Sequence, residues 1–524
     1  MRALWSDLFD DAVRIILENI TDDIKLIRLM RLNKASSSMA KEVFQARHGL
    51  EHEQAVAAIK VMLGTNLFIT GGPGTGKSFT TSLLIRMAKR RFGSRGVAVC
   101  APTWLAAGNV GGESIDRTLG FRKMCPTKLP TTVLMQHEVE HKHPPVEEET
   151  EQVVNDDEEE IDDDEMFAPV YSEFVARRLS GLRVIFIDEV SMVSDYKLSL
   201  VHAALRRYCG EQMPQFVLVA DFCQLPPIIC NGTLEHAAVK RGEFEDFCFL
   251  GDTWASLTLS TAELKVSRRC GNFEYNDKVL ARMRMGVFDF SCKKTFQRLA
   301  SKDTMSMWQA AKAGRLGLFG TNLACKTFDV MTLQSHDQAP LRTKFSVDTP
   351  TTWGRQCAKL PSRIQYKVGL RAIALTRIGE VGAKDCILRG TLLDVLGEDD
   401  DDCVRVGDDG NEIPMRRAEV EKVYFKKGEG SQISTREQFP FKHCASLTVH
   451  KAQGRTVRME QYIDFATTKW ARKMNGMLYT LLSRTSDPAF IAYANIHAAH
   501  NFIDPRVLLF YRRASAAAAP FWTR

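Results

Sequence analysis

Short apolar runs alternate with amphipathic stretches along most of the chain from about Asn66 onward. The runs NLFIT, VAVCA, VIFID and FVLVAD are each followed by turn residues and then by apolar positions at helical spacing. Such alternation is typical of a parallel sheet with helices on both faces. The C-terminal stretch from HCASLTVHKAQG to MLYTLLSRTSDPAFIAYAN predicts a second region of this kind. The predicted fold class is therefore α/β, with two parallel-sheet regions.

Three segments depart from this rhythm. Residues 1–40 carry apolar positions at helical spacing, which predicts a small helical segment. Residues 127–166 are too charged and too poor in apolar side chains to bury anything, which predicts a disordered acidic insertion. Residues 336–439 contain short β-rich runs with Gly and Asp turns, which predict a small β-barrel inserted in the second region.

These patterns suggest how the chain divides. At 524 residues it is too long for one hydrophobic core, so two or more domains are expected. We place a first domain at residues 41–260 and a second at 261–335 and 440–500, followed by a C-terminal tail at 501–524.

Composition and charge indicate where the protein works and what kind of partner it can bind. No apolar run approaches the roughly 20 residues that span a bilayer, and charges interrupt the start of the chain, so neither a membrane segment nor a signal peptide is predicted. An intracellular location is expected, and the basic stretch 89–95 leaves a nuclear address open beside the simpler interpretation of a solvated helix end. The 13 scattered cysteines lack zinc-finger spacing, which favours free thiols and no structural metal. The net charge of +6 includes the acidic run, so the remainder is basic enough for a polyanionic partner.

The segment GGPGTGKS at residues 71–78 has the spacing of a phosphate-binding loop and lies between a strand and a predicted helix. The glycines let backbone N–H groups surround a phosphate, and the helix N-terminus adds partial positive charge. Lys77 would bridge the β- and γ-phosphates of ATP, and Ser78 would ligate Mg²⁺. The predicted ATP-binding residues here are Gly72, Gly74, Thr75, Gly76, Lys77, Ser78 and Phe79.

Polar residues also end two later predicted strands. Asp188 and Glu189 follow VIFI, where Asp188 would hold Mg²⁺ and Glu189 would polarise the attacking water. Gln224 follows FVLVA in the segment DFCQLPP and could hydrogen-bond the γ-phosphate. Each pattern taken alone also fits an ordinary polar strand end. The neighbouring phosphate loop favours a catalytic interpretation.

The ordered series GGPGTGKS, APTWLAA, IDEVSMV, ADFCQLPP, LTVHKAQGRT and YTLLSRTSD resembles the RecD/Pif-like group of superfamily 1 (subgroup B) DNA helicases. The resemblance covers about Leu50 to Asn495 and implies two RecA-like P-loop NTPase domains with ATP between them. It further implies single-stranded DNA across both domains, movement from 5′ to 3′ on tailed duplex DNA, and work in DNA replication, recombination or repair. The pattern of residues 1–40 weakly resembles an F-box, which would recruit a ubiquitin-ligase adaptor.

The resemblance also implies roles for residues around the nucleotide. Gln54 matches the upstream glutamine that reads the adenine edge, and Arg484 matches the arginine that reaches the γ-phosphate from the second domain. A second arginine is expected in KVSRRCGNF; Arg269 is favoured because the following Cys replaces the family's usual Gln, with Arg268 as the alternative. Gln453 and Gly454 lie where the family couples the nucleic-acid loop to the nucleotide.

For the nucleic-acid track the resemblance implies two kinds of contact. Hydroxyls and a lysine suit phosphates, and an aromatic ring offers a stacking platform for any base. Phe222 would provide the ring, although packing in the core is an equal alternative. The implied residues are Thr103, Phe222, Thr448, His450 and Lys451.

The chain departs from the family pattern at several positions. Trp104 replaces a small residue after APT, Ser114-Ile115-Asp116 stands where Thr-Ile-His is usual, and Ala220 replaces a Gly. The first two put strand grip and substrate preference in doubt more than ATP hydrolysis. Backbone contacts and stacking suit DNA and RNA alike, so an RNA helicase or non-unwinding translocase of the same superfamily is one alternative. A DNA-binding scaffold whose N-terminal helices recruit a ligase adaptor is a second alternative, from another class. A nuclear or viral replication setting is likewise undecided.

Overall fold

The computed structural model describes most of the chain. The described residues are 45–46, 48–121, 173–301, 305–349, 360–378, 387–400, 403–408, 411–426, 430–465 and 474–517. The N-terminal segment predicted over residues 1–40, with its F-box-like pattern, and the acidic insertion predicted over residues 127–166 lie outside the described residues.

A six-stranded parallel sheet forms the centre of the first domain, in the order β3-β2-β4-β5-β1-β6. Successive side chains of a strand point to opposite faces, and β1 shows this directly because Leu67 and Ile69 join one core while Phe68 joins the other. The strands are β1 (Leu67–Gly71), β2 (Val97–Ala101), β3 (Glu113–Ser114), β4 (Val184–Ile187), β5 (Gln215–Val219) and β6 (Ser260–Leu264).

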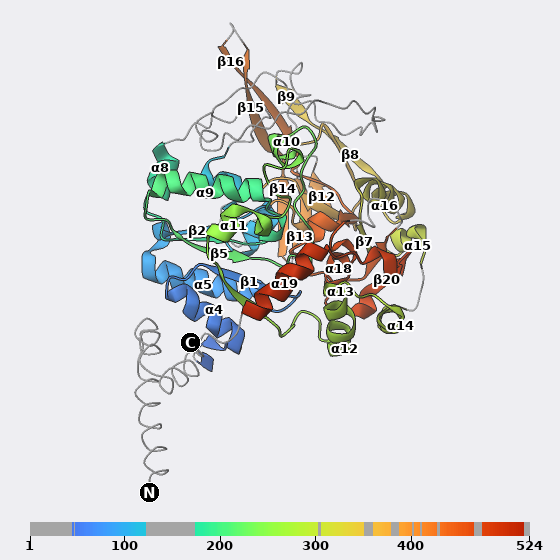
Figure 1. The fold of residues 1–524 in the computed structure, drawn as a ribbon. Helices are drawn as coiled ribbons and strands as arrows, with labels where there is room; N and C mark the ends of the chain where they lie inside the picture. The colour runs from blue at the N-terminus through green and yellow to red at the C-terminus, as the bar shows by residue number, and fades with distance from the viewer. Residues whose placement is uncertain are drawn as a thin grey trace, which may run out of the picture.

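Helices cover both faces of this sheet (Figure 1). The helices α4 (His52–Met62) and α5 (Lys77–Phe92) pack on one face, and α9 (Asp195–Cys209) packs on the other. The parallel α/β arrangement predicted from the apolar runs is thus present. The shorter helices of this domain are α6 (Trp104–Asn109), α7 (Ile115–Leu119), α8 (Glu173–Leu179), α10 (Leu234–Lys240) and α11 (Asp252–Ser256).

The second domain has a four-stranded parallel sheet in the order β18-β7-β19-β20. Its strands come from distant parts of the sequence: β7 (Leu316–Phe319), β18 (Ser446–Thr448), β19 (Gln461–Asp464) and β20 (Ile491–Ala494). The accompanying helices are α12 (Phe273–Tyr275), α13 (Arg282–Arg284), α14 (Phe290–Leu299), α15 (Met307–Lys312), α16 (Asn322–Ser335), α17 (Val449–Ala452) and α18 (Met477–Leu482).

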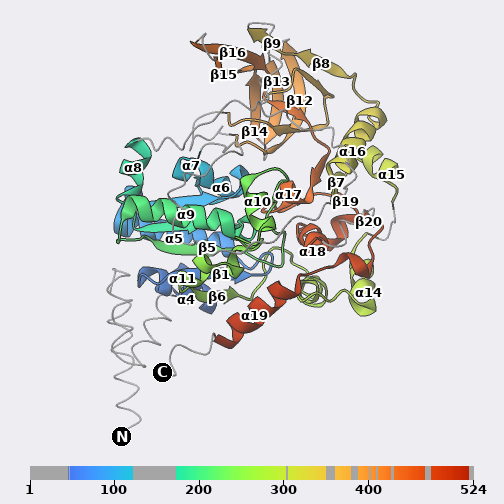
Figure 2. The same ribbon diagram turned by 45° about the horizontal axis from the view of Figure 1, so that its top comes forward.

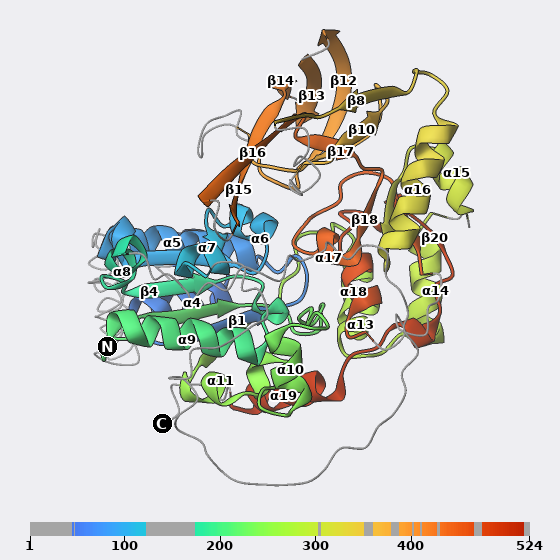
Figure 3. The same ribbon diagram turned by 90° about the horizontal axis from the view of Figure 1, so that it is seen from above.

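A β-rich insertion separates α16 from β18. It contains sheets of two, five and three strands, ordered β10-β8, β14-β13-β12-β11-β17 and β15-β16-β9. Figures 2 and 3 show it on the side of the molecule where α6 and α7 lie. Its strands are β8 (Arg342–Phe345), β9 (Val347–Thr349), β10 (Arg363–Tyr366), β11 (Arg371–Ala374), β12 (Leu392–Asp400), β13 (Cys403–Asp408), β14 (Asn411–Arg416), β15 (Ala418–Lys426), β16 (Gly430–Gln438) and β17 (Phe441–His443).

The end of the chain corrects the prediction of a C-terminal tail. Residues 505–517 form the helix α19 (Pro505–Ala517), which runs from the second domain back along the first (Figure 1). Its Phe510 ring lies 6.0 Å from Trp254 of α11, and Tyr511 is buried. The helix docks there because an aromatic cluster on the first domain, formed by Phe68, Phe249 and Trp254, packs around Phe510.

The described cysteines are all free thiols. Within the same residues, none of the helices has both the length and the apolar character needed to cross a bilayer.

Candidate ATP site and nucleic-acid track

The loop at residues 71–78 joins β1 to the N-terminus of α5 and is tightly packed. Gly74 and Gly76 have φ of +76° and +85°, a left-handed backbone that glycine adopts without a Cβ penalty. A Cβ on Gly74 would come within 2.4 Å of the Arg269 Cβ, and one on Gly76 within 2.7 Å of the Gln54 Nε2. The glycines are therefore required by close approach, and the loop is a cradle of backbone N–H groups that suits a phosphate.

Lys77 is half-buried and folds back onto this loop. Its Nζ donates to the carbonyl oxygens of Gly71 at 2.7 Å and Gly72 at 3.0 Å. Burial lowers the pKa of Lys77, while the carboxylates of Asp221 and Glu189 oppose that change. The ammonium is thus held at the loop, where phosphate oxygens could replace the two carbonyls as its partners. Thr75 is buried and donates its hydroxyl to the Gly72 carbonyl at 2.9 Å.

The acidic pair ends β4 beside the loop. Asp188 is buried, and its Oδ1 accepts a hydrogen bond from the Glu189 backbone N at 2.9 Å. Burial raises the pKa of Asp188, and the neighbouring Glu189 carboxylate adds to the shift. Glu189 itself has a φ of +52°, an uncommon backbone for a non-glycine residue. The pair fits a site whose negative charge is balanced by a cation such as Mg²⁺ with Ser78.

The two arginines of KVSRRCGNF point to different partners. Arg269 is half-buried, and its Nη1 donates to the Ser483 carbonyl of the second domain at 3.0 Å. Arg268 is exposed and forms an ion pair with Glu51. The backbone of this segment also holds the phosphate loop, because Arg268 N donates to the Gly74 carbonyl at 2.7 Å. Of the two, Arg269 is therefore the arginine that contacts the second domain, and its catalytic role stays a prediction.

Arg484 crosses from the second domain to the segment DFCQLPP. Its side chain is only 1% exposed, and its Nη2 donates to the Gln224 Oε1 at 3.2 Å. The Gln224 Nε2 donates in turn to the Asp221 Oδ2 at 3.4 Å. Burial lowers the pKa of Arg484 to about 9, with the nearby Arg269 contributing. Both domains thus meet around Gln224.

A second contact between the domains reaches the acidic pair. The Gln453 Nε2 donates to the Glu189 Oε2 at 3.0 Å. Beside it, the Asn109 Nδ2 donates to the Gly454 carbonyl at 3.3 Å. Gly454 has a φ of +79°, and a Cβ there would lie 3.8 Å from the Glu189 Oε1. The predicted coupling glycine therefore lies next to the proposed catalytic carboxylate.

An open cleft continues from these contacts toward the insertion. It combines residues of the first domain, the second domain and β12 of the insertion. Its lining residues are Ser78, Leu105, Asn109, Arg269, Leu316, Leu392, Gly454, Arg455, Thr456, Val457 and Met459.

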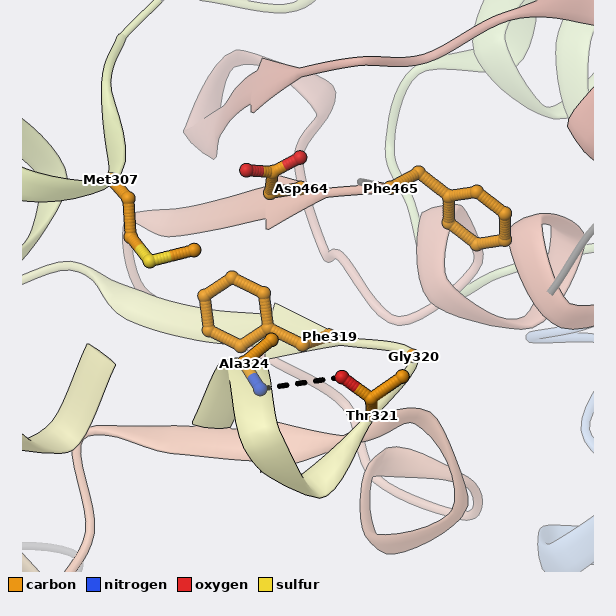
Figure 4. A pocket seen from close by; sticks show the side chains of 7 residues that line it. All are labelled: Met307, Phe319, Gly320, Thr321, Ala324, Asp464 and Phe465. Carbon is orange, nitrogen blue, oxygen red and sulfur yellow. Dashed lines mark hydrogen bonds between the residues drawn. The ribbon is translucent and has the colours of Figure 1, made fainter. Parts of the chain in front are cut away.

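The corresponding edge of the second sheet is different. Figure 4 shows a hollow at the ends of β7 and β19, lined by Met307, Phe319, Gly320, Thr321, Ala324, Asp464 and Phe465. Thr321 caps α16 by accepting a hydrogen bond from the Ala324 N at 3.3 Å. The segment FGTN at this edge lacks the lysine and the glycine spacing of a phosphate loop. Within the described residues, the phosphate loop belongs to the first domain.

Four of the predicted nucleic-acid residues differ in accessibility. Lys451 is exposed, while Thr448 is buried and His450 is partly buried. The Thr103 Oγ1 accepts from the Ala106 N at 3.2 Å and so caps α6. A capping hydroxyl keeps its own proton, so Thr103 can still donate to a phosphate. Thr103 and Lys451 are thus the two best suited to bind a backbone.

Phe222 corrects the prediction of a stacking platform. Its side chain is 1% exposed, so the alternative of core packing holds. Its ring lies 4.7 Å from Phe249, 5.3 Å from Phe68 and 5.4 Å from Phe510. These aromatic neighbours come from segments far apart in the sequence and exclude a nucleobase from the ring.

Trp104 instead offers an aromatic surface to solvent. It begins α6 directly after Thr103, is 41% exposed, and has the Arg117 guanidinium 5.5 Å from its ring.

The other two departures from the family pattern are accommodated locally. Asp116, where the family has His, forms an ion pair with Lys197 of α9. Ala220, where the family has Gly, is buried without a positive φ, so its methyl group is accommodated.

Sequence reasoning missed several residues that hold the segment DFCQLPP. The Tyr479 hydroxyl donates to the Asp221 Oδ2 at 2.8 Å. The Asn475 Nδ2 donates to the carbonyls of Phe222 at 2.9 Å and Gln224 at 2.7 Å. Tyr479 stands in the motif YTLLSRTSD, which was the available signal; Asn475 had none.

Comparisons with known proteins agree with this geometry. A family model described as an AAA domain matches residues 53–229. The "ATP-dependent DNA helicase Pif1" of Bdellovibrio bacteriovorus is 23% identical over 475 residues, which cover 88% of this chain and 92% of that protein. The human "ATP-dependent DNA helicase PIF1" is 24% identical over 488 residues, 88% of this chain and 63% of that protein.

Solved structures show the same fold. The Pif1 helicase from Candida albicans has a TM-score of 0.64 at 22% identity and covers 88% of this chain and 99% of that chain. Bacteroides Pif1 bound to ssDNA also has a TM-score of 0.64, at 21% identity, covering 89% of this chain and 97% of that chain.

The fold and site define a P-loop NTPase with two RecA-like domains that meet over the phosphate loop. The chain is similar to Pif1 helicases along most of its length and shares their fold.

Proposed function

We propose that this chain is an ATP-dependent DNA helicase that moves along single-stranded DNA from 5′ to 3′ and displaces the complementary strand. Its named relatives are ATP-dependent DNA helicases, and structural neighbours are described with ssDNA and with forked dsDNA. Motion requires that the nucleotide state and the DNA grip be coupled. The site geometry supplies candidates for each part.

In the proposed ATP site, the first domain binds the nucleotide and the second domain contributes an arginine that contacts the γ-phosphate. The loop at residues 71–78 would surround the phosphates, and Gln54, which lies against Gly76, would read the base. Ser78 and Asp188 would hold Mg²⁺, which neutralises charge on the phosphates when bound. Glu189 would orient the attacking water. Arg269 and Arg484 would stabilise the charge that develops on the γ-phosphate.

One observation carries the proposal: Gln453 of the second domain donates to Glu189 of the first at 3.0 Å. Gln453 follows directly after α17, the helix that holds His450 and the exposed Lys451. A shift of α17 on DNA would therefore move a hydrogen-bond partner of the proposed catalytic carboxylate. The reverse also holds, because coupling between two sites is reciprocal.

The DNA track would run over α6 and α17. Thr103 and Lys451 would bind phosphates, and the exposed Trp104 would stack on a base. Such contacts do not depend on sequence, which suits a motor that must pass over any DNA.

The deciding experiment measures steady-state ATP hydrolysis with and without single-stranded DNA or RNA at low and high salt. Unwinding of duplexes tailed at 5′ or 3′ is measured in parallel, with Lys77→Ala as the inactive control. We expect stimulation by DNA that weakens with salt, and unwinding of the 5′-tailed duplex only. Hydrolysis indifferent to either polymer would refute the helicase, stronger stimulation by RNA would move the proposal to RNA, and unwinding from a 3′ tail would reverse the polarity.

A further inference from the structure

The last described helix, α19, contacts two segments that lead into the ATP site. α19 follows the second domain, yet its Phe510 and Tyr511 pack on the first. The Phe510 ring lies 4.6 Å from Phe249 and 5.8 Å from Phe68, a residue of β1. The helix is thus anchored to the strand that ends in the phosphate loop.

The Tyr511 hydroxyl joins two segments of the site. It accepts a hydrogen bond from the Phe222 backbone N at 2.9 Å. It also lies 2.8 Å from the Thr70 Oγ1, and a tyrosine that accepts from Phe222 can donate its own proton there. Thr70 directly precedes Gly71 of the phosphate loop, and Phe222 stands two residues before Gln224. One buried hydroxyl therefore connects the start of the loop with the segment that carries Gln224.

Arg284 fixes the ring of Tyr511 in place. Its guanidinium lies 4.6 Å from the ring, its Nε donates to the Asp221 Oδ1 at 3.2 Å, and its Nη1 donates to the Glu263 Oε1 at 2.9 Å. Arg284 comes from α13, outside the first sheet. A cation over an aromatic face is attractive, and more so where water is excluded.

The chain leading into α19 is tied to the second domain. The Asp504 N donates to the Asn475 Oδ1 at 2.8 Å, and the Gly476 N donates to the Phe502 carbonyl at 2.8 Å. Asn475 also holds the carbonyls of Phe222 and Gln224. Movement of the second domain would therefore act on the Gln224 segment at Asn475 and, through α19, at Tyr511.

We propose that α19 is a strap between the two domains and that Tyr511 is a positioning residue for ATP hydrolysis. Its hydroxyl keeps the Gln224 segment and the start of the phosphate loop in register when the domains close. Tyr511 touches neither nucleotide nor DNA in this role. The inference rests on the proposed ATPase function.

The test is Tyr511→Phe, which keeps the ring over Arg284 and removes only the hydroxyl. At saturating ATP with single-stranded DNA, kcat should fall about tenfold, the change that loss of one well-made hydrogen bond produces. The KM for ATP should stay within about threefold, because the phosphate loop keeps its own contacts, and the melting temperature should stay within a few degrees.

The matched control is Tyr196→Phe. Tyr196 is also buried in the first domain, and its hydroxyl has no hydrogen-bond partner among the described residues. The Tyr196→Phe variant should therefore retain the wild-type kcat. Equal losses in both variants, or wild-type kcat in Tyr511→Phe, would overturn the strap while leaving the ATPase intact.

A second variant keeps the proposal testable if Tyr511→Phe folds poorly. Thr70→Val removes one partner of the same hydroxyl and nearly preserves side-chain shape. Its kcat should also fall, and the double variant should lose less than the product of the two single effects, because both act through one contact. If the double variant lost as much kcat as the product of the two single effects, the proposal would be overturned. A wild-type protein without ATPase activity would instead refute the proposed function itself.

Discussion

The guanidinium of Arg484 donates to the side-chain oxygen of Gln224 at 3.2 Å, across the boundary between the two RecA-like domains. Both side chains are buried, so this contact is shielded from water. An arginine and a glutamine that bind each other here can both turn toward a γ-phosphate. The Arg484–Gln224 hydrogen bond would then break when ATP is bound and form again when only ADP is left.

Substituting Arg484 should therefore affect turnover more than binding. For Arg484→Ala we expect kcat to fall by about 10²- to 10³-fold, the usual cost of one transition-state donor, with a small change in the KM for ATP. Steady-state ATP hydrolysis with saturating DNA measures both. A rise in KM at unchanged kcat would show that Arg484 binds ground-state nucleotide only.

The adjacent arginines provide a test with an internal control. Arg269 is half-buried and donates to Ser483 of the second domain, whereas Arg268 is exposed and paired with Glu51. Arg269→Ala should lower kcat by about 10²-fold or more, and Arg268→Ala should change it less than about threefold, since exposed ion pairs contribute little. Equal losses in the two variants would contradict this assignment.

Gln453 should matter for coupling rather than for basal hydrolysis. Gln453→Ala removes the hydrogen bond to Glu189, so we expect stimulation of the ATPase by single-stranded DNA to fall about tenfold while DNA binding persists. Gln453→Glu should be worse, because it places a second carboxylate beside the first. The surface variant Gln212→Ala serves as the control. Wild-type stimulation in Gln453→Ala would remove the main support for the proposed coupling.

Trp104 should contribute to DNA affinity through stacking. Loss of one base–aromatic stack costs about 1–3 kcal/mol, so Trp104→Ala should weaken single-stranded DNA binding by about 5- to 150-fold, and Trp104→Phe should restore part of it. Trp308 is a matched control on α15, with 46% exposure against 41% for Trp104. Fluorescence anisotropy with oligo-dT measures the affinities. If Trp308→Ala and Trp104→Ala weaken binding equally, the stacking assignment is wrong.

Asp329 should make stability depend on pH. This α16 residue accepts hydrogen bonds from the Ala445 N at 2.9 Å and the Ser446 Oγ at 2.8 Å, and burial raises its pKa to about 6. The folded state therefore holds a proton that the unfolded state releases near pH 4. Between about pH 4 and pH 6 the contribution of Asp329 to stability should decrease as pH rises.

Asp329→Asn keeps an acceptor oxygen and removes the charge. It should stabilise the protein on the order of 2 kcal/mol more at pH 7.5 than at pH 4.5, relative to wild type. Thermal unfolding at the two pH values measures the difference, and the exposed Asp337→Asn is the control. A variant that is equally destabilised at both pH values would show that the carboxylate is needed as a charge.

Local sequence was sufficient for the phosphate loop, the parallel strands and the order of the motifs. Strand alternation and glycine spacing are properties of neighbouring residues, so GGPGTGKS between a strand and a helix is enough to predict a phosphate loop. The favoured choice of Arg269 over Arg268 also came from the adjacent residues.

Only the tertiary structure decided which side chains meet. Phe222 is buried because Phe68, Phe249 and Phe510 surround it, and a residue just after a strand carries no local signal for that burial. Residues 505–517 form a docked helix rather than a tail because the first domain offers an aromatic cluster to receive it. The Gln453–Glu189 contact joins residues 264 positions apart. Such contacts depend on how two domains pack, and periodicity along the chain cannot encode them.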